Sequence, residues 1–147
     1  MNPVRSIIAV LGGIGLISLV TEALEFTLVR AAAGGPIPDM AAYFAVRNGP
    51  AILAAKLVYN TLAAVLGGYM TAKVAGGREV PHAVVGALVQ TAALIWGFTA
   101  SEYAGFTPVW MRVALVLLTG PAMVAGGLVR ARATEAQSTL VTNRTSS

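Results

Sequence analysis

Residues 6–28 read SIIAVLGGIGLISLVTEALEFTL, and this stretch decides the fold. No charged residue interrupts it before Glu22, so most of its length is apolar. A helix needs about 20 apolar residues to cross a hydrocarbon core of about 30 Å. A membrane-spanning strand would need only about 10 residues and would alternate apolar with polar side chains, which this stretch does not do. Residues 6–28 therefore predict a transmembrane helix.

Three more apolar runs follow, at about residues 51–71, 81–98 and 109–129. Of 147 residues, 56% are hydrophobic and 11% are charged, whereas soluble domains are about 25% charged. This composition excludes a disordered chain and a nucleic-acid-binding one. We predict an all-α membrane protein, a four-transmembrane-helix bundle within residues 1–130. Residues 131–147 form a polar cytoplasmic tail without apolar periodicity, which we expect to be disordered on its own.

The basic residues set the expected orientation, because cytoplasmic loops carry an excess of Lys and Arg. If the N-terminus is inside, that side carries Arg5, Lys73, Arg78, Arg130, Arg132 and Arg144, and the opposite side carries Arg30, Arg47 and Arg112. The bias predicts a multi-pass protein with both termini in the cytoplasm and the lipid bilayer around it. It also accounts for the formal net charge of +4 without a nucleic-acid partner.

The first outer loop contains a predicted short interfacial helix. Asp39 can cap its N-terminus, and the helix would run over residues 40–47. The sequence Asn48-Gly49-Pro50 should end this helix and begin the second span. We expect Tyr43 and Phe44 to be exposed, because aromatic side chains suit the membrane interface.

Polar and charged residues within the spans are the candidate functional residues, because such groups are costly in lipid. We predict an intramembrane polar cluster of Glu22, Glu25, Lys56, Asn60, Gln90 and Arg112. At about 1.5 Å per residue, Glu22 and Lys56 lie at matching depths on neighbouring antiparallel helices, so we expect them to pair.

One face of the first span combines small and polar residues. Gly12, Gly15, Ser18, Glu22 and Glu25 recur every three or four residues and so share a helix face. Small residues let helix backbones approach each other in lipid. We therefore expect this face to turn toward the other helices.

The polar cluster has two interpretations. It could be an ion or proton path or a site for a polar ligand, or it could be a structural ion pair that fixes how the helices pack. The sequence has no nucleophile or metal-binding constellation beside Glu22 and Glu25 and no cysteine, so we expect neither a catalytic nor a metal site.

His82 is the only histidine, and it follows Pro81 at the start of the third span. It could be an axial ligand to a haem or a chlorophyll-type pigment. Its more common role at such a position is a hydrogen bond at the interface. A single histidine cannot form a bis-histidine haem site within one chain, so we expect no cofactor.

Residues 67–78 read GGYMTAKVAGGR, and residues 81–87 read PHAVVGA. This helix hairpin resembles small bacterial four-helix membrane proteins of unknown function, in which a Gly-Gly-rich helix end, a basic turn and a His-Ala pair precede the next span. The resemblance implies the fold and a bacterial inner membrane. It implies no activity and no functional residue.

These observations predict a non-enzymatic accessory or assembly subunit of a larger membrane complex, such as a respiratory or photosynthetic one. The small-residue helix faces suit packing against other integral membrane subunits or self-association. The alternative is a small oligomeric transporter or channel for ions, protons or a polar solute, which would use Glu22, Glu25 and Lys56.

Overall fold

The computed structural model describes residues 3–145, and these are almost entirely helical. Its elements are α1 (Pro3–Ala33), α2 (Met40–Arg47), α3 (Pro50–Ala75), α4 (Glu79–Ala100), a short 3-10 helix η1 (Ala104–Phe106) and α5 (Val109–Thr145). The described residues form no strand. By length and composition, α1, α3, α4 and α5 are long and apolar enough to cross a membrane. The prediction of an all-helical chain with four such helices is confirmed.

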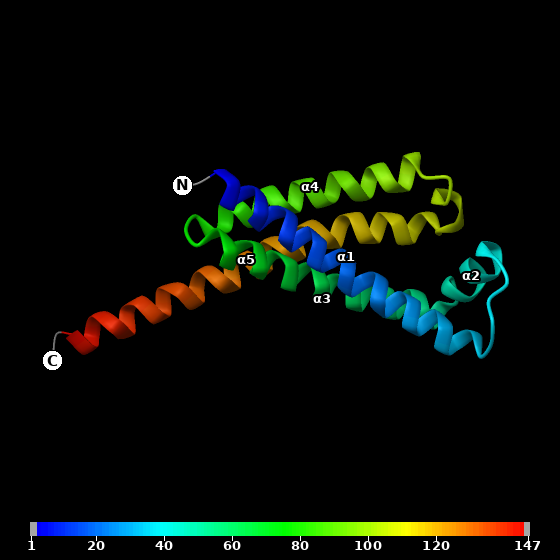
Figure 1. Ribbon diagram of the computed structural model, residues 1–147, viewed down its shortest axis with the longest axis horizontal. Coiled ribbons are helices and arrows are strands. Elements are labelled where there is room, and N and C mark those ends of the chain that lie inside the picture. Colours follow the sequence, from blue (N-terminus) through cyan, green and yellow to red (C-terminus); the bar gives the residue numbers. More distant parts are fainter. Residues whose placement is uncertain (1–2, 146–147) are drawn as a thin grey trace.

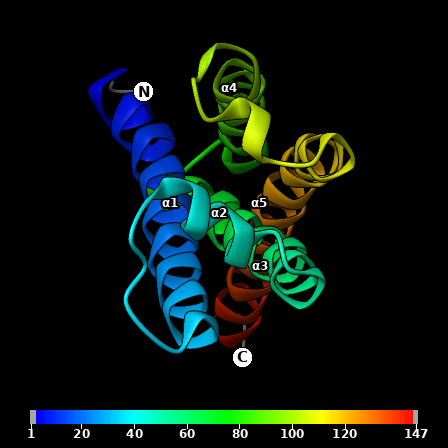
Figure 2. The same cartoon turned by 90° about the vertical axis from the view of Figure 1, so that its right-hand side faces the viewer.

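Helix α3 is central to the packing. It contacts α1 on one side and α5 on the other, and α4 packs mainly on α5 (Figures 1 and 2). Helices α1 and α4 contact each other less extensively, and they diverge toward the end of the molecule where α2 lies (Figure 1). A cavity lined by residues of both helices lies at this end.

Glycines allow α3 to approach both of its main neighbours closely. A Cβ atom on Gly68 would overlap the carbonyl of Met123 on α5, and one on Gly126 would overlap the carbonyl of Val65 on α3. On the other side of α3, a Cβ atom on Gly13 of α1 would overlap Thr71. These three glycines therefore serve contacts within the chain, as close backbone packing requires.

Helix α1 is rotated relative to our expectation. Its buried residues are Ala9, Gly13, Ile17, Glu25 and Val29, which lie four or eight positions apart. The predicted inward face is wrong except at Glu25, because Gly12, Gly15, Ser18 and Glu22 are exposed. The reason is that α1 contacts α3 through Gly13 and Ile17, which fit against Gly67 and Thr71, rather than through its polar residues.

Helix α2 has the predicted bounds and the predicted cap. The Asp39 side chain accepts a hydrogen bond from the backbone N–H of Ala42 at 2.8 Å, and Pro50 begins α3 two residues after the C-cap Asn48. The expected exposure of Phe44 is wrong. Its ring is buried and stacks on Phe106 with a centroid separation of 4.8 Å. The loop between α4 and α5 covers α2, which the sequence alone did not reveal.

Helix α5 continues well beyond the predicted span. The expectation of a disordered tail is wrong for residues 131–145, which are helical, and residues 146–147 lie outside the described part of the chain (Figure 1). No Gly or Pro follows Gly127, and Ala, Arg, Glu and Gln are good helix formers. The Thr134 hydroxyl donates to Glu79 Oε1 at 2.9 Å, so the first turn of this extension is also tied to α4.

Candidate functional site

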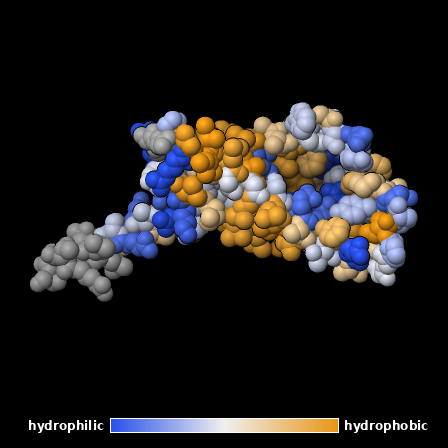
Figure 3. All heavy atoms as spheres, viewed as in Figure 1, coloured by the Kyte–Doolittle hydropathy of each residue, from blue (hydrophilic) through white to orange (hydrophobic). Residues whose placement is uncertain are grey.

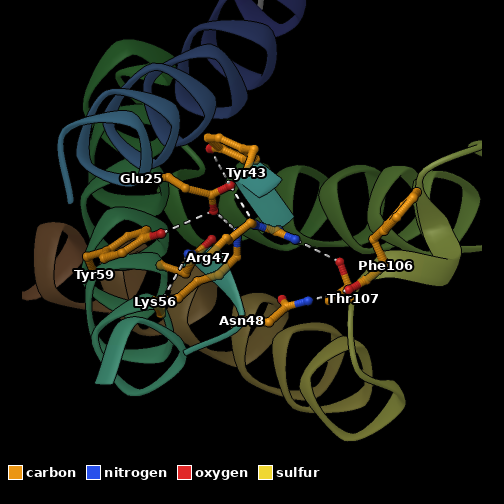
Figure 4. Close-up of polar contacts among 9 residues, drawn as sticks. Glu25, Tyr43, Arg47, Asn48, Lys56, Tyr59, Phe106 and Thr107 are labelled. Atoms are coloured by element: carbon orange, nitrogen blue, oxygen red, sulfur yellow. Dashed lines mark hydrogen bonds and ion pairs between the residues drawn. The ribbon is translucent and has the colours of Figure 1, made fainter. Parts of the chain in front are cut away.

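A buried carboxylate at the α2 end of the molecule organises the candidate site. Glu25 is 7% exposed, and its Oε1 accepts hydrogen bonds from Arg47 Nε at 2.7 Å and from the Tyr43 hydroxyl at 3.3 Å (Figure 4). Its Oε2 accepts from Lys56 Nζ and from the Tyr59 hydroxyl at 3.2 Å. One carboxylate therefore receives four donors, two of them cationic.

The network joins four segments of the chain. Glu25 belongs to α1, Tyr43 and Arg47 to α2, and Lys56 and Tyr59 to α3. Arg47 also donates through Nη1 to the Thr107 hydroxyl at 2.9 Å, which connects the network to the loop before α5. We define these six residues, Glu25, Tyr43, Arg47, Lys56, Tyr59 and Thr107, as the Glu25 network.

The network contains two cations and one carboxylate, and the exposed Glu22 supplies a second negative charge close to both cations. Glu25 supplies one negative charge, and Arg47 and Lys56, both less than 10% exposed, supply two positive charges. Burial lowers the pKa of Arg47, but a guanidinium stays protonated in proteins. Burial raises the pKa of Tyr43, so its hydroxyl keeps its proton and remains a donor to Glu25. A buried ion is tolerated when its partners satisfy it, as they do here.

Lys56 pairs with Glu25, so the predicted Glu22–Lys56 pair is wrong. Helical side chains lean toward the N-terminus of their helix. Because α1 and α3 run in opposite directions, Lys56 leans toward the α2 end and a carboxylate on α1 leans away from it. The two side chains therefore meet when the Cα atom of the glutamate lies nearer the α2 end than the Cα atom of Lys56 does. Glu25 meets this condition better than Glu22.

The remaining predicted cluster residues lie outside the Glu25 network. Asn60 donates to the carbonyl of Lys56 on its own helix at 2.9 Å. Arg112 donates through Nε to the carbonyl of Thr107 at 2.7 Å, so it stabilises the loop before α5. Gln90 is 8% exposed and lies on α4, away from the Glu25 network. Within the described part of the chain, the six predicted residues make one contact between side chains, Glu25 with Lys56, while Asn60 contacts only the backbone of Lys56.

The sequence interpretation missed Arg47, Tyr43, Tyr59 and Thr107. A signal for the first two was available, because residues four apart on a helix share a face and the predicted helix 40–47 places Tyr43 and Arg47 in this way. Arg47 was counted only as a loop charge. No local pattern indicates Thr107, because its contact with Arg47 depends on how the α4–α5 loop folds over α2.

His82 has a partner for each ring nitrogen. Its Nδ1 lies 2.8 Å from the carbonyl oxygen of Arg78, and its Nε2 lies 3.1 Å from the hydroxyl of Ser6 on α1. Neither nitrogen is free to act as an axial ligand in this arrangement. Among residues 3–145 there is also no group of three or more His, Cys, Asp or Glu that could hold a metal ion.

A cavity of about 510 Å³ lies beside the Glu25 network, between α1 and α4. Its wall is mainly apolar and aromatic, with Ser18, Arg47 and Gln90 among its polar residues. Figure 3 shows hydrophilic atoms within the hollow between the two helices at the α2 end. Pockets of 300–1,000 Å³ with few polar groups in an apolar wall are typical of small-molecule sites.

Comparison with known proteins gives no relative of this chain. No family model matches the sequence, and neither the curated proteins nor the solved structures contain a significant match.

Proposed function

We propose that this chain is a non-enzymatic accessory or assembly subunit of a larger bacterial membrane complex, such as a respiratory or photosynthetic one. The observation that carries the proposal is the closed Glu25 network. A carboxylate that moves ions or protons must exchange its partners, whereas Glu25 accepts four hydrogen bonds from two helices at once. Such an arrangement favours a structural role, which fixes α1, α2 and α3 relative to one another.

The exposed face of α1 is the surface that we propose for a partner subunit. Only 17% of the residues in its most apolar segment are buried, against 39% in α3. Gly12 and Gly15 lie on this face, and a Cβ atom added to either would meet nothing within 4 Å. The aliphatic residues Ile8 and Leu19 flank them one turn away on each side. Small residues between aliphatic ones suit the close approach of a second helix.

The first test is the size of the assembly that contains the chain. The tagged protein would be extracted from its native membrane with a mild detergent, run on a native gel, and identified with its companions by mass spectrometry. We expect migration in a large assembly that contains other membrane proteins. Migration as a free chain or as a small oligomer of this chain alone would overturn the proposal and direct attention to transport by the Glu25 network.

A pair of variants locates the partner surface. Gly12→Leu combined with Gly15→Leu fills open space on α1, so the chain should fold and yet be lost from the assembly. Ala125→Leu is the control, because Ala125 is exposed on α5, away from α1. If both variants stay in the assembly, the partner does not bind this face of α1.

A further inference from the structure

The cavity between α1 and α4 is closed toward the α2 end of the molecule. Phe44 and Arg47 of α2 and Thr107 of the α4–α5 loop line it there. The Phe44 ring stacks on Phe106, and Arg47 donates to the Thr107 hydroxyl at 2.9 Å, so α2 and the loop are joined across this end. Figure 3 shows the hollow on the side of the molecule, between two helices that are apolar enough to cross a membrane. An occupant would therefore enter from the lipid rather than from the water beyond α2.

The charges near the cavity favour a molecule without net charge. Arg47, which lines the cavity, and Lys56 supply two positive charges. Glu25 contacts both cations, and the exposed Glu22 lies close enough to act on both. Two carboxylates therefore balance two cations. An ion would leave water for a mainly apolar wall without gaining an unpaired counter-charge, which is costly.

Aromatic side chains are concentrated in the cavity wall. Phe, Trp and Tyr make up 7% of the chain, yet four of the fourteen residues that line the cavity are aromatic. These four are Phe44, Trp96, Phe98 and Tyr103, which come from α2, α4 and the α4–α5 loop. Aromatic side chains pack on flat rings in offset-stacked or edge-to-face arrangements. The wall therefore favours a flat ring over a flexible acyl chain.

Two neutral polar side chains line the cavity from different helices. Ser18 belongs to α1 and Gln90 to α4. A hydroxyl and an amide can each donate a hydrogen bond without carrying a charge. The ring that suits this wall is therefore one that carries neutral acceptors, such as carbonyl oxygens.

We propose that this cavity binds the ring of a membrane quinone. The ring lies among the aromatic side chains, its carbonyl oxygens accept hydrogen bonds from Ser18 and Gln90, and its isoprenoid chain extends between α1 and α4 into the lipid. A quinone has no net charge, dissolves in the bilayer and carries its acceptors on a flat ring, so it combines the properties that the wall favours. Binding of this kind needs no redox step and does not depend on the proposed accessory role.

Quenching of tryptophan fluorescence by a quinone tests the proposal. Trp96 lines the cavity, Trp110 on α5 does not, and the chain has no other tryptophan. The full-length variants Trp110→Phe and Trp96→Phe would each report from one position in phosphatidylcholine vesicles to which decylubiquinone is added. We expect Trp96 to be half quenched at a mole fraction of quinone about threefold to tenfold lower than Trp110, as one or two neutral hydrogen bonds would give. Equal quenching would show contact with quinone dissolved in the bilayer only and overturn the proposal.

Dioleoylglycerol separates recognition of the ring from filling of apolar space. This lipid is neutral and carries ester carbonyls and a hydroxyl, but it has no ring. We expect an excess of dioleoylglycerol to leave the quenching of Trp96 by decylubiquinone unchanged. If it relieves the quenching, the cavity binds neutral lipids in general and the quinone proposal is wrong.

Two substitutions connect the quenching to the cavity. A Cβ atom on Gly97 would meet nothing within 4 Å, so Gly97→Leu can fill the cavity without a clash, and Gln90→Leu replaces the amide by an apolar group of similar size. Each should remove most of the difference between the two tryptophans. Gly12→Leu and Gln137→Leu are the controls, because Gly12 also faces open space, Gln137 is exposed on the α5 extension, and neither lines the cavity. If either cavity variant keeps the full difference, the quinone does not bind as proposed.

Discussion

Glu25 balances two buried cations, so its removal should destabilise the protein more than the removal of either cation. Glu25→Gln would leave Arg47 and Lys56 buried without the carboxylate that contacts both of them, and breaking a buried ion pair from one side costs about 3–5 kcal/mol. Lys56→Met would leave Glu25 paired with Arg47 and should cost no more than about 1–2 kcal/mol. The free energy of unfolding can be measured by titration with sodium dodecyl sulfate in mixed micelles.

Glu135→Gln is the control for this prediction, because Glu135 is exposed on the α5 extension, at the opposite end of the molecule from the Glu25 network. We expect its free energy of unfolding to stay within about 0.5 kcal/mol of the unchanged protein. If Lys56→Met destabilises the protein as much as Glu25→Gln does, the asymmetry is absent and Glu25 does not serve both cations.

The Glu25 site was only partly predictable at the level of residues. The sequence shows which polar residues lie in apolar spans, and this criterion finds Glu25 and Lys56. It does not show the rotation of α1, because Gly12 and Gly13 both offer a small residue to a neighbouring helix. Depth along a helix gives the height of each Cα atom, but the direction in which the side chain leans decides between Glu22 and Glu25.

At the level of elements, the packing of α3 on α5 depends on two glycines that face the opposite backbone. Gly126→Ala would place a methyl group against the carbonyl of Val65, so the helices must separate, at a cost of about 1–3 kcal/mol. Gly12→Ala meets no neighbour and should stabilise the protein by about 0.5–1 kcal/mol through helix propensity. The same Gly-to-Ala substitution is therefore expected to lower the free energy of unfolding at position 126 and to raise it at position 12. Equal effects in the same unfolding titration would contradict the close contact.

The elements themselves were largely predictable. Long apolar runs identified all four spanning candidates, and Asp39 with Asn48 and Pro50 fixed the ends of α2. The length of α5 was not predicted, because the absence of apolar periodicity was taken as the absence of structure. Helix propensity and the bond from Thr134 to Glu79 maintain the helix where no apolar face requires it.

At the level of the whole molecule, different contacts hold the two ends together. At the α2 end, the Glu25 network links α1, α2, α3 and the loop before α5. At the opposite end, Arg5 on α1 donates to the carbonyl of Val74 on α3 at 2.7 Å, and Arg130 on α5 lies 3.7 Å from Glu79 on α4. Between these ends, α1 and α4 diverge beside the cavity. One buried network therefore holds the α2 end together, whereas separate contacts between pairs of helices hold the opposite end.

Arg47 on α2 contacts both Glu25 on α1 and Thr107 in the α4–α5 loop, so a change at Arg47 should alter both α2 and this loop. Arg47→Lys keeps the charge beside Glu25 but cannot donate to Glu25 and Thr107 at the same time in the fork geometry of a guanidinium. We expect faster hydrogen–deuterium exchange in residues 101–108, which lie far from Arg47 in the sequence, as well as in α2. Exchange measured by mass spectrometry in lipid nanodiscs would show both changes.

Arg30→Lys provides the comparison for this coupling, because Arg30 is exposed at the end of α1 and lies over the Phe26 ring rather than within the Glu25 network. It should leave exchange in residues 101–108 unchanged. If Arg47→Lys accelerates exchange in α2 alone, the bond to Thr107 does not hold the loop, and the loop is positioned by the stacking of Phe106 on Phe44 instead. Acceleration in both segments would show that one guanidinium joins α1, α2 and the α4–α5 loop into a single cooperative unit.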